Sequence, residues 1–298
     1  MPLSDLQGLS DQFAAVVEKA SQSVVRVDAR HRVAGTGIVW SADGIVVTAD
    51  HVVEKEEGIE VLLSNGKSAK AELIGRDPST DVAALRLSGA SGLSTADWTE
   101  PAQVKAGHLC FALGKPWDNT PIVSGGIINA VGVGIRGHGR NGFVQSDVVM
   151  LPGFSGGPLV DASARVIGMN SSVLGRGVSL AIPVEVMRRV VNDLLKEGRV
   201  KRAYLGVGLQ PVPLAASLSD KASGQDRALM ILTVESGGPA EQSGLLPGDI
   251  LLALDGTPLT EVEALQKSLS PERVGQSVKA RVVRGGEVRE VTVKVGSR

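Results

Sequence analysis

Short apolar runs separated by tight-turn signals constrain this chain more than any other feature of its sequence. Asp43-Gly44 divides GTGIVWSA from IVVTA, and Asn65-Gly66 divides IEVLLS from KSAKAELIG. Both dipeptides favour the two-residue turn of a β-hairpin, and the flanking runs are rich in β-branched residues. Further runs of this kind are LCFALG, GGIINAV, GFVQSDVVM, GPLVDAS and RVIGMNSS. Because no helical pattern lies between them, the sequence predicts a mainly β fold, an antiparallel barrel or sandwich.

Helical patterns frame this β region. Phe13, Val16 and Val17 form one apolar stripe near the N-terminus. From Pro183, the run PVEVMRRVVNDLLKEG has apolar residues at helical spacing, and Gly198 lies just past its end. The segment that follows is short, basic and polar, which is typical of a linker. We therefore expect a first domain over 1–197 that includes the N-terminal helical segment, a linker over 198–202 and a second domain over 203–298.

The second domain has the pattern of a smaller α+β unit. Strands are expected at ALMILTV, DILLALDG, VKARVVRGG and EVREVTVKV, and a short helix at PAEQSG. A longer helix is expected from Thr260, because Thr260 and Glu263 form a T-x-x-E capping box. Pro271 would end that helix.

Charge and composition exclude several classes of function. The chain carries 31 basic and 32 acidic side chains and has no block of lysine or arginine, so it lacks the basic face that nucleic-acid binding requires. No apolar run reaches the ~18 residues that a membrane helix needs. The histidines and the one cysteine show no metal-ligand spacing, so no metal site is expected. Cys110 has no disulfide partner within the chain and is expected to be a small buried apolar residue.

The N-terminal residues bear on the compartment. MPLSDLQGLS lacks the basic and apolar regions of a secretion signal. A cytoplasmic protein is expected if Met1 is the native start, and a protein of the cell envelope or periplasm if a longer chain was trimmed.

The strongest local motif is LPGFSGGPLV, in which glycines enclose Ser155. Glycines let the backbone turn so that the amide N–H groups of Gly153 and Ser155 can converge as an oxyanion hole, typically worth about 3 kcal/mol per donor. The pattern G-x-S-x-G also occurs in α/β-hydrolases, where the catalytic histidine follows the serine. Every histidine of this chain precedes Ser155, which excludes that fold; they are His31, His51, His108 and His138.

A serine hydroxyl is a poor nucleophile until an imidazole takes its proton. His51 is the best candidate, because it lies at the end of an apolar strand, whereas His31 and His138 lie in expected loops. Asp81 opens an apolar strand segment, where a buried carboxylate can fix the tautomer of the imidazole. The order His51, Asp81, Ser155 is that of a chymotrypsin-type triad.

With these motifs in this order, the chain resembles the HtrA (Deg) family of serine proteases over about residues 11–298. The resemblance rests on GTGIVWSADGIVVTADHVV, DPSTDVAALRL, PGFSGGPLV and GPAEQSGLLPGDILLALDG. It implies a chymotrypsin-like double β-barrel protease domain, with the active site between the barrels, followed by a PDZ domain that forms a partly open β-barrel. It also implies cofactor-free cleavage of unfolded or damaged proteins in protein quality control and the stress response. The segment that contains Phe13 would join three copies into a homotrimer.

Two residues depart from the family pattern. Phe154 stands where the family usually has asparagine, and Asp50 stands where a small residue often precedes the catalytic histidine. Because Phe154 cannot make the hydrogen bonds of an amide, the turn that carries the oxyanion donors is expected to be held differently, or to rest in an inactive arrangement until activation. Asp50 is expected to be a solvated turn residue, because successive strand side chains point to opposite faces.

The resemblance also implies where peptides bind. The substrate backbone would add as a strand beside Val178-Ser179-Leu180, and the S1 pocket would lie between the Met150–Gly153 turn and residues 170–180. Because MLPG carries no charge and Arg176 is expected at a loop tip, cleavage after small or medium aliphatic residues is expected.

The glycine-rich stretch 131–142 would be the regulatory loop. The run Tyr204-Leu205-Gly206-Val207 resembles the PDZ loop whose backbone N–H groups receive a peptide C-terminus.

Two other functions stay open on the sequence. In the first, Phe154 has disabled the catalytic site, and the chain is a chaperone or adaptor that holds unfolded chains or peptide C-termini through the PDZ domain. In the second, the chain hydrolyses small esters.

Overall fold

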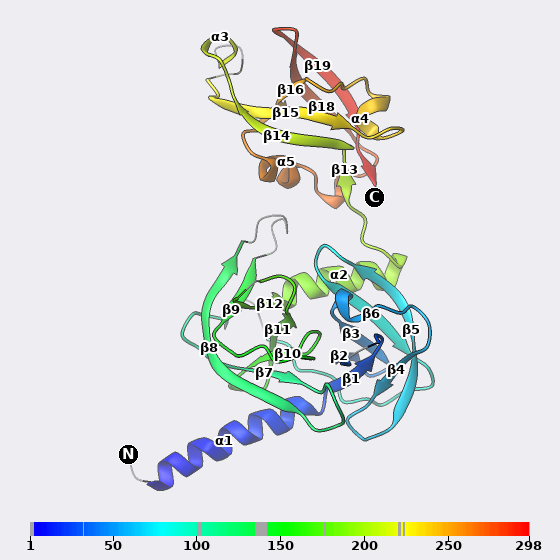
Figure 1. The fold of residues 1–298 in the computed structure, drawn as a ribbon, viewed down its shortest axis with the longest axis vertical. Coiled ribbons are helices and arrows are strands. Elements are labelled where there is room, and N and C mark those ends of the chain that lie inside the picture. Colours follow the sequence, from blue (N-terminus) through cyan, green and yellow to red (C-terminus); the bar gives the residue numbers. More distant parts are fainter. Residues whose placement is uncertain are drawn as a thin grey trace. The chain divides into compact units, whose positions relative to one another are not determined.

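The computed structural model describes residues 3–31, 33–99, 103–134, 142–175, 177–219, 222 and 224–297. The chain divides into two compact units, Met1–Val200 and Lys201–Arg298 (Figure 1). The first unit contains two closed six-stranded β-barrels. The second contains an open antiparallel sheet, a small two-stranded sheet and short helices. The predicted fold class is therefore confirmed.

The first barrel has the strand order β1-β2-β3-β6-β5-β4. Its strands are β1 (Val24–Asp28), β2 (Gly35–Ser41), β3 (Ile45–Thr48), β4 (Ile59–Leu62), β5 (Ser68–Asp77) and β6 (Val82–Leu87). Both expected hairpins are present, one between β2 and β3 and one between β4 and β5. Gly44 and Gly66 adopt φ of 101° and 81°, a conformation that glycine takes without steric strain.

The second barrel has the strand order β10-β11-β12-β9-β8-β7. Its strands are β7 (Leu109–Gly114), β8 (Ile122–Val133), β9 (Phe143–Ser146), β10 (Pro158–Asp161), β11 (Val166–Ser171) and β12 (Ser179–Pro183). Each apolar run that predicted a strand in this region contributes to one of them. Each of these strands contributes an apolar side chain to one buried cluster, among them the β-branched residues Ile128, Val144 and Ile167.

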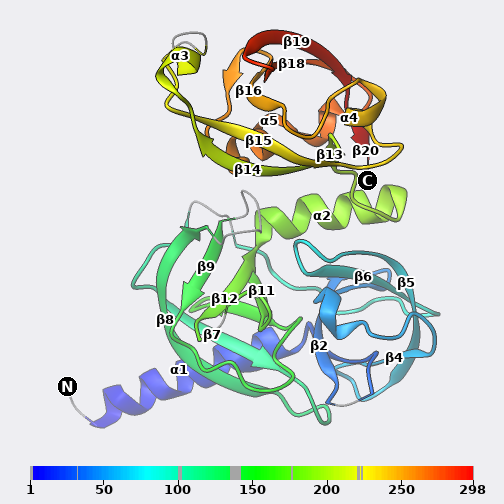
Figure 2. The same ribbon diagram turned by 45° about the horizontal axis from the view of Figure 1, so that its top comes forward.

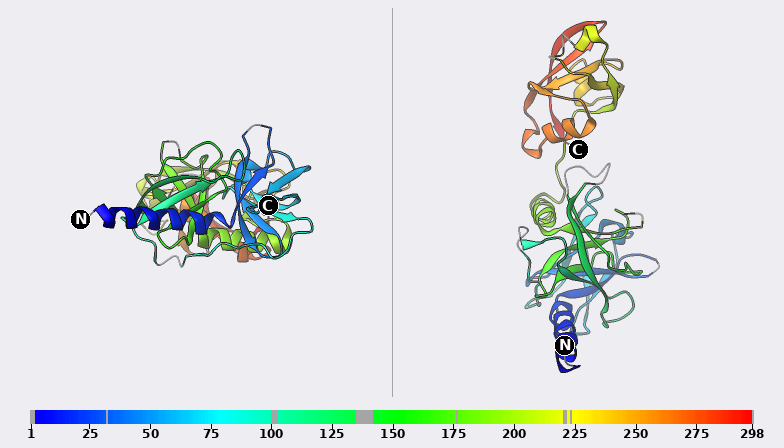
Figure 3. Two further views of the ribbon diagram at one scale, coloured as in Figure 1. Left: turned by 90° about the horizontal axis from the view of Figure 1, so that it is seen from below. Right: turned by 90° about the vertical axis from the view of Figure 1, so that its left-hand side faces the viewer.

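Two helices pack against the barrels. Helix α2 (Val184–Glu197) begins after Pro183, and its first and last residues agree with the helix predicted from the sequence. Its buried face contacts strands of both barrels (Figure 2). Gly198, at φ 71°, ends the helix by donating its N–H to the Leu194 carbonyl at 2.8 Å. Helix α1 (Leu3–Ser21) lies against β7, and its N-terminal end extends beyond the barrels (Figure 3).

The second unit has a sheet in the order β14-β15-β16-β18-β19. The strands of this sheet are β14 (Val207–Pro213), β15 (Arg227–Val234), β16 (Ile250–Leu254), β17 (Thr257–Pro258), which pairs with β16, β18 (Ser277–Arg284) and β19 (Glu287–Lys294). A separate two-stranded sheet is formed by β13 (Ala203–Tyr204) and β20 (Gly296–Ser297). Its helices are α3 (Ala216–Ser219), α4 (Pro239–Gln242), α5 (Val262–Ser268) and the 3₁₀ turn η4 (Pro271–Arg273).

The start predicted for α5 is wrong. The helix begins at Val262, and Glu261 takes the N-cap position without a side-chain hydrogen bond. Glu261 is extended, with φ −138° and ψ 155°, so the backbone turns into the helix only after it. Thr260 therefore lies one residue before the cap position, and the capping box does not form.

Candidate active site

The barrel topology brings His51 and Asp81 together. His51 lies in the 3₁₀ turn η1 (Asp50–Val52), just after β3, and Asp81 directly precedes β6. The antiparallel register of β3 and β6 pairs Thr48 with Ala83, so the end of one strand lies beside the start of the other. Ser155 comes from the second barrel, in the turn between β9 and β10.

A buried carboxylate holds the imidazole of His51. The Nδ1 atom lies 2.9 Å from both carboxylate oxygens of Asp81, whose side chain is 3% exposed. Asp81 also accepts the backbone N–H of His51 at 3.0 Å and the hydroxyl of Ser171. A carboxylate accepts only, so Nδ1 carries the proton and Nε2 presents a lone pair. This is the tautomer that a general base requires.

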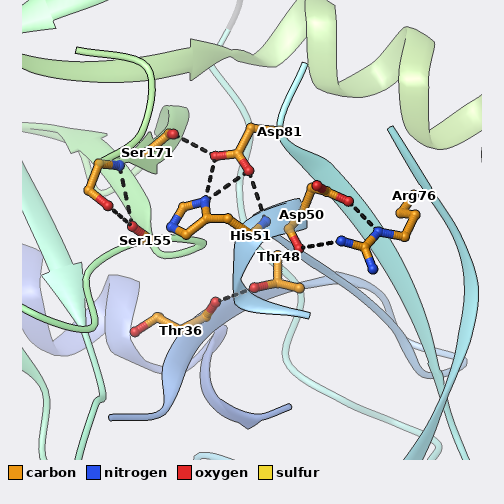
Figure 4. A network of polar contacts seen from close by, with 9 residues as sticks. Thr36, Thr48, Asp50, His51, Arg76, Asp81, Ser155 and Ser171 are labelled. Atoms are coloured by element: carbon orange, nitrogen blue, oxygen red, sulfur yellow. Dashed lines mark hydrogen bonds and ion pairs between the residues drawn. The ribbon is translucent and has the colours of Figure 1, made fainter. Parts of the chain in front are cut away.

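The nucleophile candidate lies in the same cluster but is turned to another partner (Figure 4). The Oγ atom of Ser155 lies 2.9 Å from the Oγ atom of Ser172 and accepts the Ser172 N–H at 3.3 Å. The Nε2 atom of His51 is buried and has no hydrogen-bond partner among the described residues. The cluster therefore contains all three predicted side chains, with the hydroxyl directed to Ser172 rather than to the imidazole.

Thr36 of β2 joins the first barrel to the turn that carries Ser155. Its hydroxyl donates to the Gly153 carbonyl at 2.7 Å, and its N–H donates to the Ser155 carbonyl at 3.1 Å. Within the described part of the chain, the N–H groups of Gly153 and Ser155 have no acceptor. Gly153 has φ 86°, and a Cβ there would come within 2.3 Å of Pro116. The turn thus leaves two amide donors free where an oxyanion hole was predicted.

The side chain of Phe154 anchors this turn in the apolar core of the second barrel. Its side chain is fully buried in the second barrel, and its backbone N–H donates to the Leu151 carbonyl at 3.1 Å. The ring lies against the backbone of Gly114, where an added Cβ would be 2.5 Å from Cδ1 of Phe154. The side chain of residue 154 therefore holds the turn by apolar packing, beside the hydrogen bonds of the backbone and of Thr36.

The expectation that Asp50 is solvated is wrong. Its side chain is buried, and Arg76 of β5 donates to its carboxylate through Nε and to its carbonyl through Nη2 at 3.2 Å. The η1 turn directs Asp50 toward the end of β5, instead of continuing the alternation of β3. The hydrogen bond with Asp50 raises the pKa of the Arg76 guanidinium above its ordinary value.

The expected peptide-binding edge at Val178-Ser179-Leu180 is not free along its length. Leu180 pairs with Ser171 on one side and with Gln145 on the other, so its backbone is already used inside the barrel. Ser179 pairs with Ser146. The S1 pocket between Met150–Gly153 and residues 170–180 stays a prediction, and Arg176 lies outside the described residues.

Sequence reasoning missed three hydroxyl residues of the site. Thr36, Ser171 and Ser172 contact Gly153, Asp81 and Ser155 respectively, and each lies far from its partner in sequence. The only local signal was a polar Ser-Ser pair at the end of the apolar run of β11. The other histidines do not join the site: His31 and His108 are exposed, and His138 and most of the expected regulatory loop (131–142) lie outside the described residues.

The cysteine and the acidic residues suggest no further centre. Cys110 is fully buried, as predicted, and burial raises the pKa of its thiol to about 12. In the described ranges, no group of three His, Cys, Asp or Glu side chains could hold a metal ion.

In the second unit, the loop Tyr204-Leu205-Gly206-Val207 connects β13 to β14. Gly206 has φ 76°, and its carbonyl accepts the Glu235 N–H at 2.8 Å. The strand that follows, β14, pairs with β15 on one side only and has no strand partner on its other edge among the described residues. Apolar side chains of β14, of α5 and of the residue after α5 pack against the adjacent core: Val207, Leu209, Val262 and Leu269.

Two family models match the chain, a trypsin-like peptidase domain over residues 35–169 and a PDZ domain over residues 203–295. A probable periplasmic serine endoprotease, DegP-like, of Halomonas elongata is 38% identical over 269 residues, covering 88% of this chain and 56% of that protein. Its counterpart in Ectopseudomonas mendocina is 36% identical over 307 residues, covering 99% and 64%. The chain thus spans less than two thirds of the length of these relatives.

Solved structures match the chain over nearly its whole length. The HtrA-type protease AlgW with tripeptide is 30% identical, with a TM-score of 0.78 over 96% of this chain and 97% of that one. The serine endoprotease from Yersinia pestis is 28% identical, with a TM-score of 0.80 over 96% and 98%.

Proposed function

Because the chain belongs to the HtrA (Deg) family of serine proteases, we propose that it is a serine endopeptidase with Ser155 as nucleophile, His51 as general base and Asp81 as the residue that holds the imidazole. The pairing of His51 Nδ1 with the buried Asp81 carboxylate, beside Ser155, carries the proposal. It prepares Nε2 to accept a proton from the serine hydroxyl.

The reaction begins when the Ser155 hydroxyl turns toward Nε2 of His51. Its Oγ attacks the scissile carbonyl as the proton passes to Nε2, and Asp81 stabilises the imidazolium that forms. The N–H groups of Gly153 and Ser155 receive the oxyanion, each contributing about 3 kcal/mol. The imidazolium then protonates the leaving amine, and water hydrolyses the acyl ester on Ser155 by the same proton transfers.

The proposed substrates are unfolded or damaged proteins, cleaved after small or medium aliphatic residues. Extended chains would reach the nucleophile beside Ser172, the first residue beyond β11, which is exposed next to Ser155. Exposed Leu151 and Val173, in the two segments expected to form the S1 pocket, favour an apolar side chain. A peptide library in which Lys, Arg or Asp dominates at P1 would refute this preference.

Proteolysis by the wild type beside Ser155→Ala tests the central proposal. Casein digestion is expected from the wild type only, together with labelling of Ser155 by a fluorophosphonate probe. Equal or absent digestion in both proteins would favour the alternative, a catalytically impaired chaperone or adaptor, toward which the contact between Ser155 and Ser172 points. Turnover of an activated ester without digestion of casein would indicate a hydrolase of small esters.

The second unit is proposed to bind peptide C-termini at Tyr204, Leu205, Gly206 and Val207. The turn at Gly206 and the open edge of β14 support this, because a peptide can add there as a strand while backbone N–H groups receive its carboxylate. Full-length Ser155→Ala should bind a fluorescent peptide with an apolar C-terminal residue saturably. The same peptide with an amidated C-terminus is the control, and equal affinity for both would contradict the proposal.

A homotrimer is proposed for the assembly. Apolar side chains remain exposed along α1 and on the outer faces of β7 and β8: Leu6, Leu9, Leu109, Val123 and Ile127. Between α1 and these strands lies a mostly apolar cavity of about 710 Å³. Phe13 and Phe111 line it, and their ring centroids are 5.4 Å apart. A second copy could cover this surface. Sedimentation should give a trimer for the wild type and a smaller species for Phe13→Asp.

The compartment is proposed from the relatives, which are named periplasmic. None of the helices in the described ranges has the length and apolarity to cross a membrane. Fractionation of the source cells, with antibody detection, distinguishes an envelope from a cytoplasmic location.

A further inference from the structure

We propose that Ser172 is a positioning residue that holds the Ser155 hydroxyl away from His51 until substrate arrives. The two contacts from Ser172 to Oγ of Ser155, one from its hydroxyl and one from its N–H, are called the Ser172 latch here. This inference rests on the proposed function, because it assigns a resting and a reactive position to the same nucleophile.

The latch uses the hydrogen-bonding capacity that catalysis would need. The Ser172 N–H donates to Oγ of Ser155 at 3.3 Å, and the two hydroxyl oxygens are 2.9 Å apart. Either serine can donate the proton of this hydroxyl pair. When Ser155 donates it, that proton is not given to the imidazole, because a hydroxyl has one proton to donate. The Nε2 atom of His51, meanwhile, is buried and without a partner among the described residues.

The resting arrangement therefore carries an unfavourable feature that a rotation would remove. A buried acceptor without a hydrogen bond is destabilising, and turning Ser155 about its Cα–Cβ bond to another staggered position would satisfy it. That rotation exchanges the contacts with Ser172 for one with Nε2. The Ser155 side chain thus has two alternative positions, one bonded to Ser172 and one bonded to His51. An interaction that favours one of them shifts their populations.

Substrate can supply that bias. Ser172 is exposed and lies directly beyond β11, so the main chain of an extended peptide can approach its N–H. A peptide carbonyl that accepts this N–H withdraws it from Ser155, which weakens the latch as the scissile bond arrives. Occupancy of the cleft and release of the nucleophile are thereby coupled.

The neighbouring serine has the opposite role. The Ser171 hydroxyl donates to Asp81, so it supports the carboxylate that holds His51. Removal of the Ser171 hydroxyl should slow the reaction, whereas removal of the Ser172 hydroxyl should speed formation of the reactive position. Removal of the hydroxyl group is therefore expected to have opposite effects on the reaction at these two adjacent residues.

The experiment measures the second-order rate of Ser155 labelling by a fluorophosphonate, together with kcat and KM on a peptide substrate. Ser172→Ala and Ser172→Val should label about twofold to tenfold faster than the wild type, the factor that one net hydrogen bond represents. Their kcat/KM should rise by a similar factor, mainly through a lower KM, because bound substrate has already released the latch. Ser172→Thr keeps the hydroxyl and should match the wild type. Ser163→Ala, which removes an exposed hydroxyl from the β10–β11 hairpin, is the matched control.

Labelling of Ser172→Ala and Ser172→Val at or below the wild-type rate would overturn the latch while leaving the proposed protease intact. A rise that also occurs in Ser172→Thr would overturn it as well, since the hydroxyl would then be irrelevant. If neither the wild type nor any variant is labelled or cleaves substrate, the proposed function fails together with the latch. Because Val and Thr have the same shape, a folding defect from added bulk would appear in both and is separated from the loss of the hydroxyl.

Discussion

Packing around Phe154 determines how the two amide donors of the active site are presented. The Phe154 ring is fully buried, and the backbone of Gly114 lies directly against it. Gly153 and Ser155 flank Phe154 in the chain, so any displacement of the ring moves both N–H groups. The absence of a side chain at residue 114 is therefore a condition for the geometry of the turn.

Gly114→Ala should disrupt this turn. Its Cβ would lie 2.5 Å from Cδ1 of Phe154, and overpacking of this kind typically costs about 1–3 kcal/mol. We expect a lower unfolding midpoint and at least a roughly tenfold slower fluorophosphonate labelling, the effect of weakening one oxyanion donor. Gly134→Ala is the control, because no atom of the described residues lies within 4 Å of its added Cβ. Labelling of Gly114→Ala at the wild-type rate would show that the ring does not position the amides.

The ion pair of Asp50 and Arg76 is a second feature at the residue scale. Arg76→Met leaves a buried carboxylate without its partner beside His51, which should lower the free energy of unfolding by about 2 kcal/mol. Asp50→Asn combined with Arg76→Met removes that charge, so the double variant should recover part of the loss in urea unfolding. Losses that simply add would contradict a direct coupling between the two side chains.

Individual elements show why the barrels form a stable frame. Helix α2 contacts strands of both barrels, and the Gly198 carbonyl that follows it lies so close to Gly75 of β5 that an added Cβ there would be 2.1 Å away. Strand β7 turns Cys110 and Ala112 into the interior of the second barrel. Such elements are held by packing, so their side chains become reactive only when the barrel opens.

Cys110 provides a direct measure of that opening. Burial raises the pKa of its thiol from 9.0 to about 12, so the thiolate, the form that alkylating agents attack, is scarce in the folded barrel. At pH 8, iodoacetamide should modify the native protein about a thousandfold more slowly than the urea-unfolded chain. The contribution of this neutral thiol to stability is present below pH 9.0 and is lost as the pH rises toward 12. Equal rates in the native and unfolded protein would contradict the burial of β7.

At the scale of the whole molecule, each unit has an apolar core of its own. The first unit buries residues of both barrels and α2 in one large cluster, and the second buries an independent set that includes Leu205, Leu251 and Val282. All three tryptophans lie in the first unit, whereas the only tyrosine lies in the second. The unfolding of the two units can therefore be followed separately.

Asp249→Asn should destabilise the second unit alone. Burial opposes ionisation of Asp249, but its hydrogen bonds with Arg284 and the Leu246 N–H outweigh burial and lower its pKa. Replacing the carboxylate weakens its charged hydrogen bonds with the partly exposed Arg284, which should cost about 2 kcal/mol near neutral pH. The far-UV transition of the second unit should shift, while tryptophan fluorescence of the first is unchanged.

The acid dependence of that effect has a definite sign. Stability from a carboxyl with a lowered pKa is present above its ordinary value and lost as the pH falls through the lowered one. The wild type and Asp249→Asn should therefore converge in stability on acidification. A difference that persists unchanged at low pH would show that the charge of Asp249 is not its origin.

The sequence by itself determined what depends on neighbours along the chain. Turn dipeptides, apolar periodicity and a glycine after a helical run act over a few residues, so they located the hairpins, the strands and α2 correctly. Places at strand ends and in a glycine-rich turn likewise selected His51, Asp81 and Ser155, and the structure brings them into one cluster.

Only the tertiary structure decided which distant side chains meet. The partners of Ser155, Asp81 and Asp50 lie 17, 90 and 26 residues away, in strands or turns that become neighbours through barrel closure. For the same reason Leu180, which was predicted to lie on an edge that pairs with substrate, is paired with a strand on each side in the folded barrel. Local patterns specify elements, whereas hydrogen-bond partners and free edges depend on how the closed sheets align those elements.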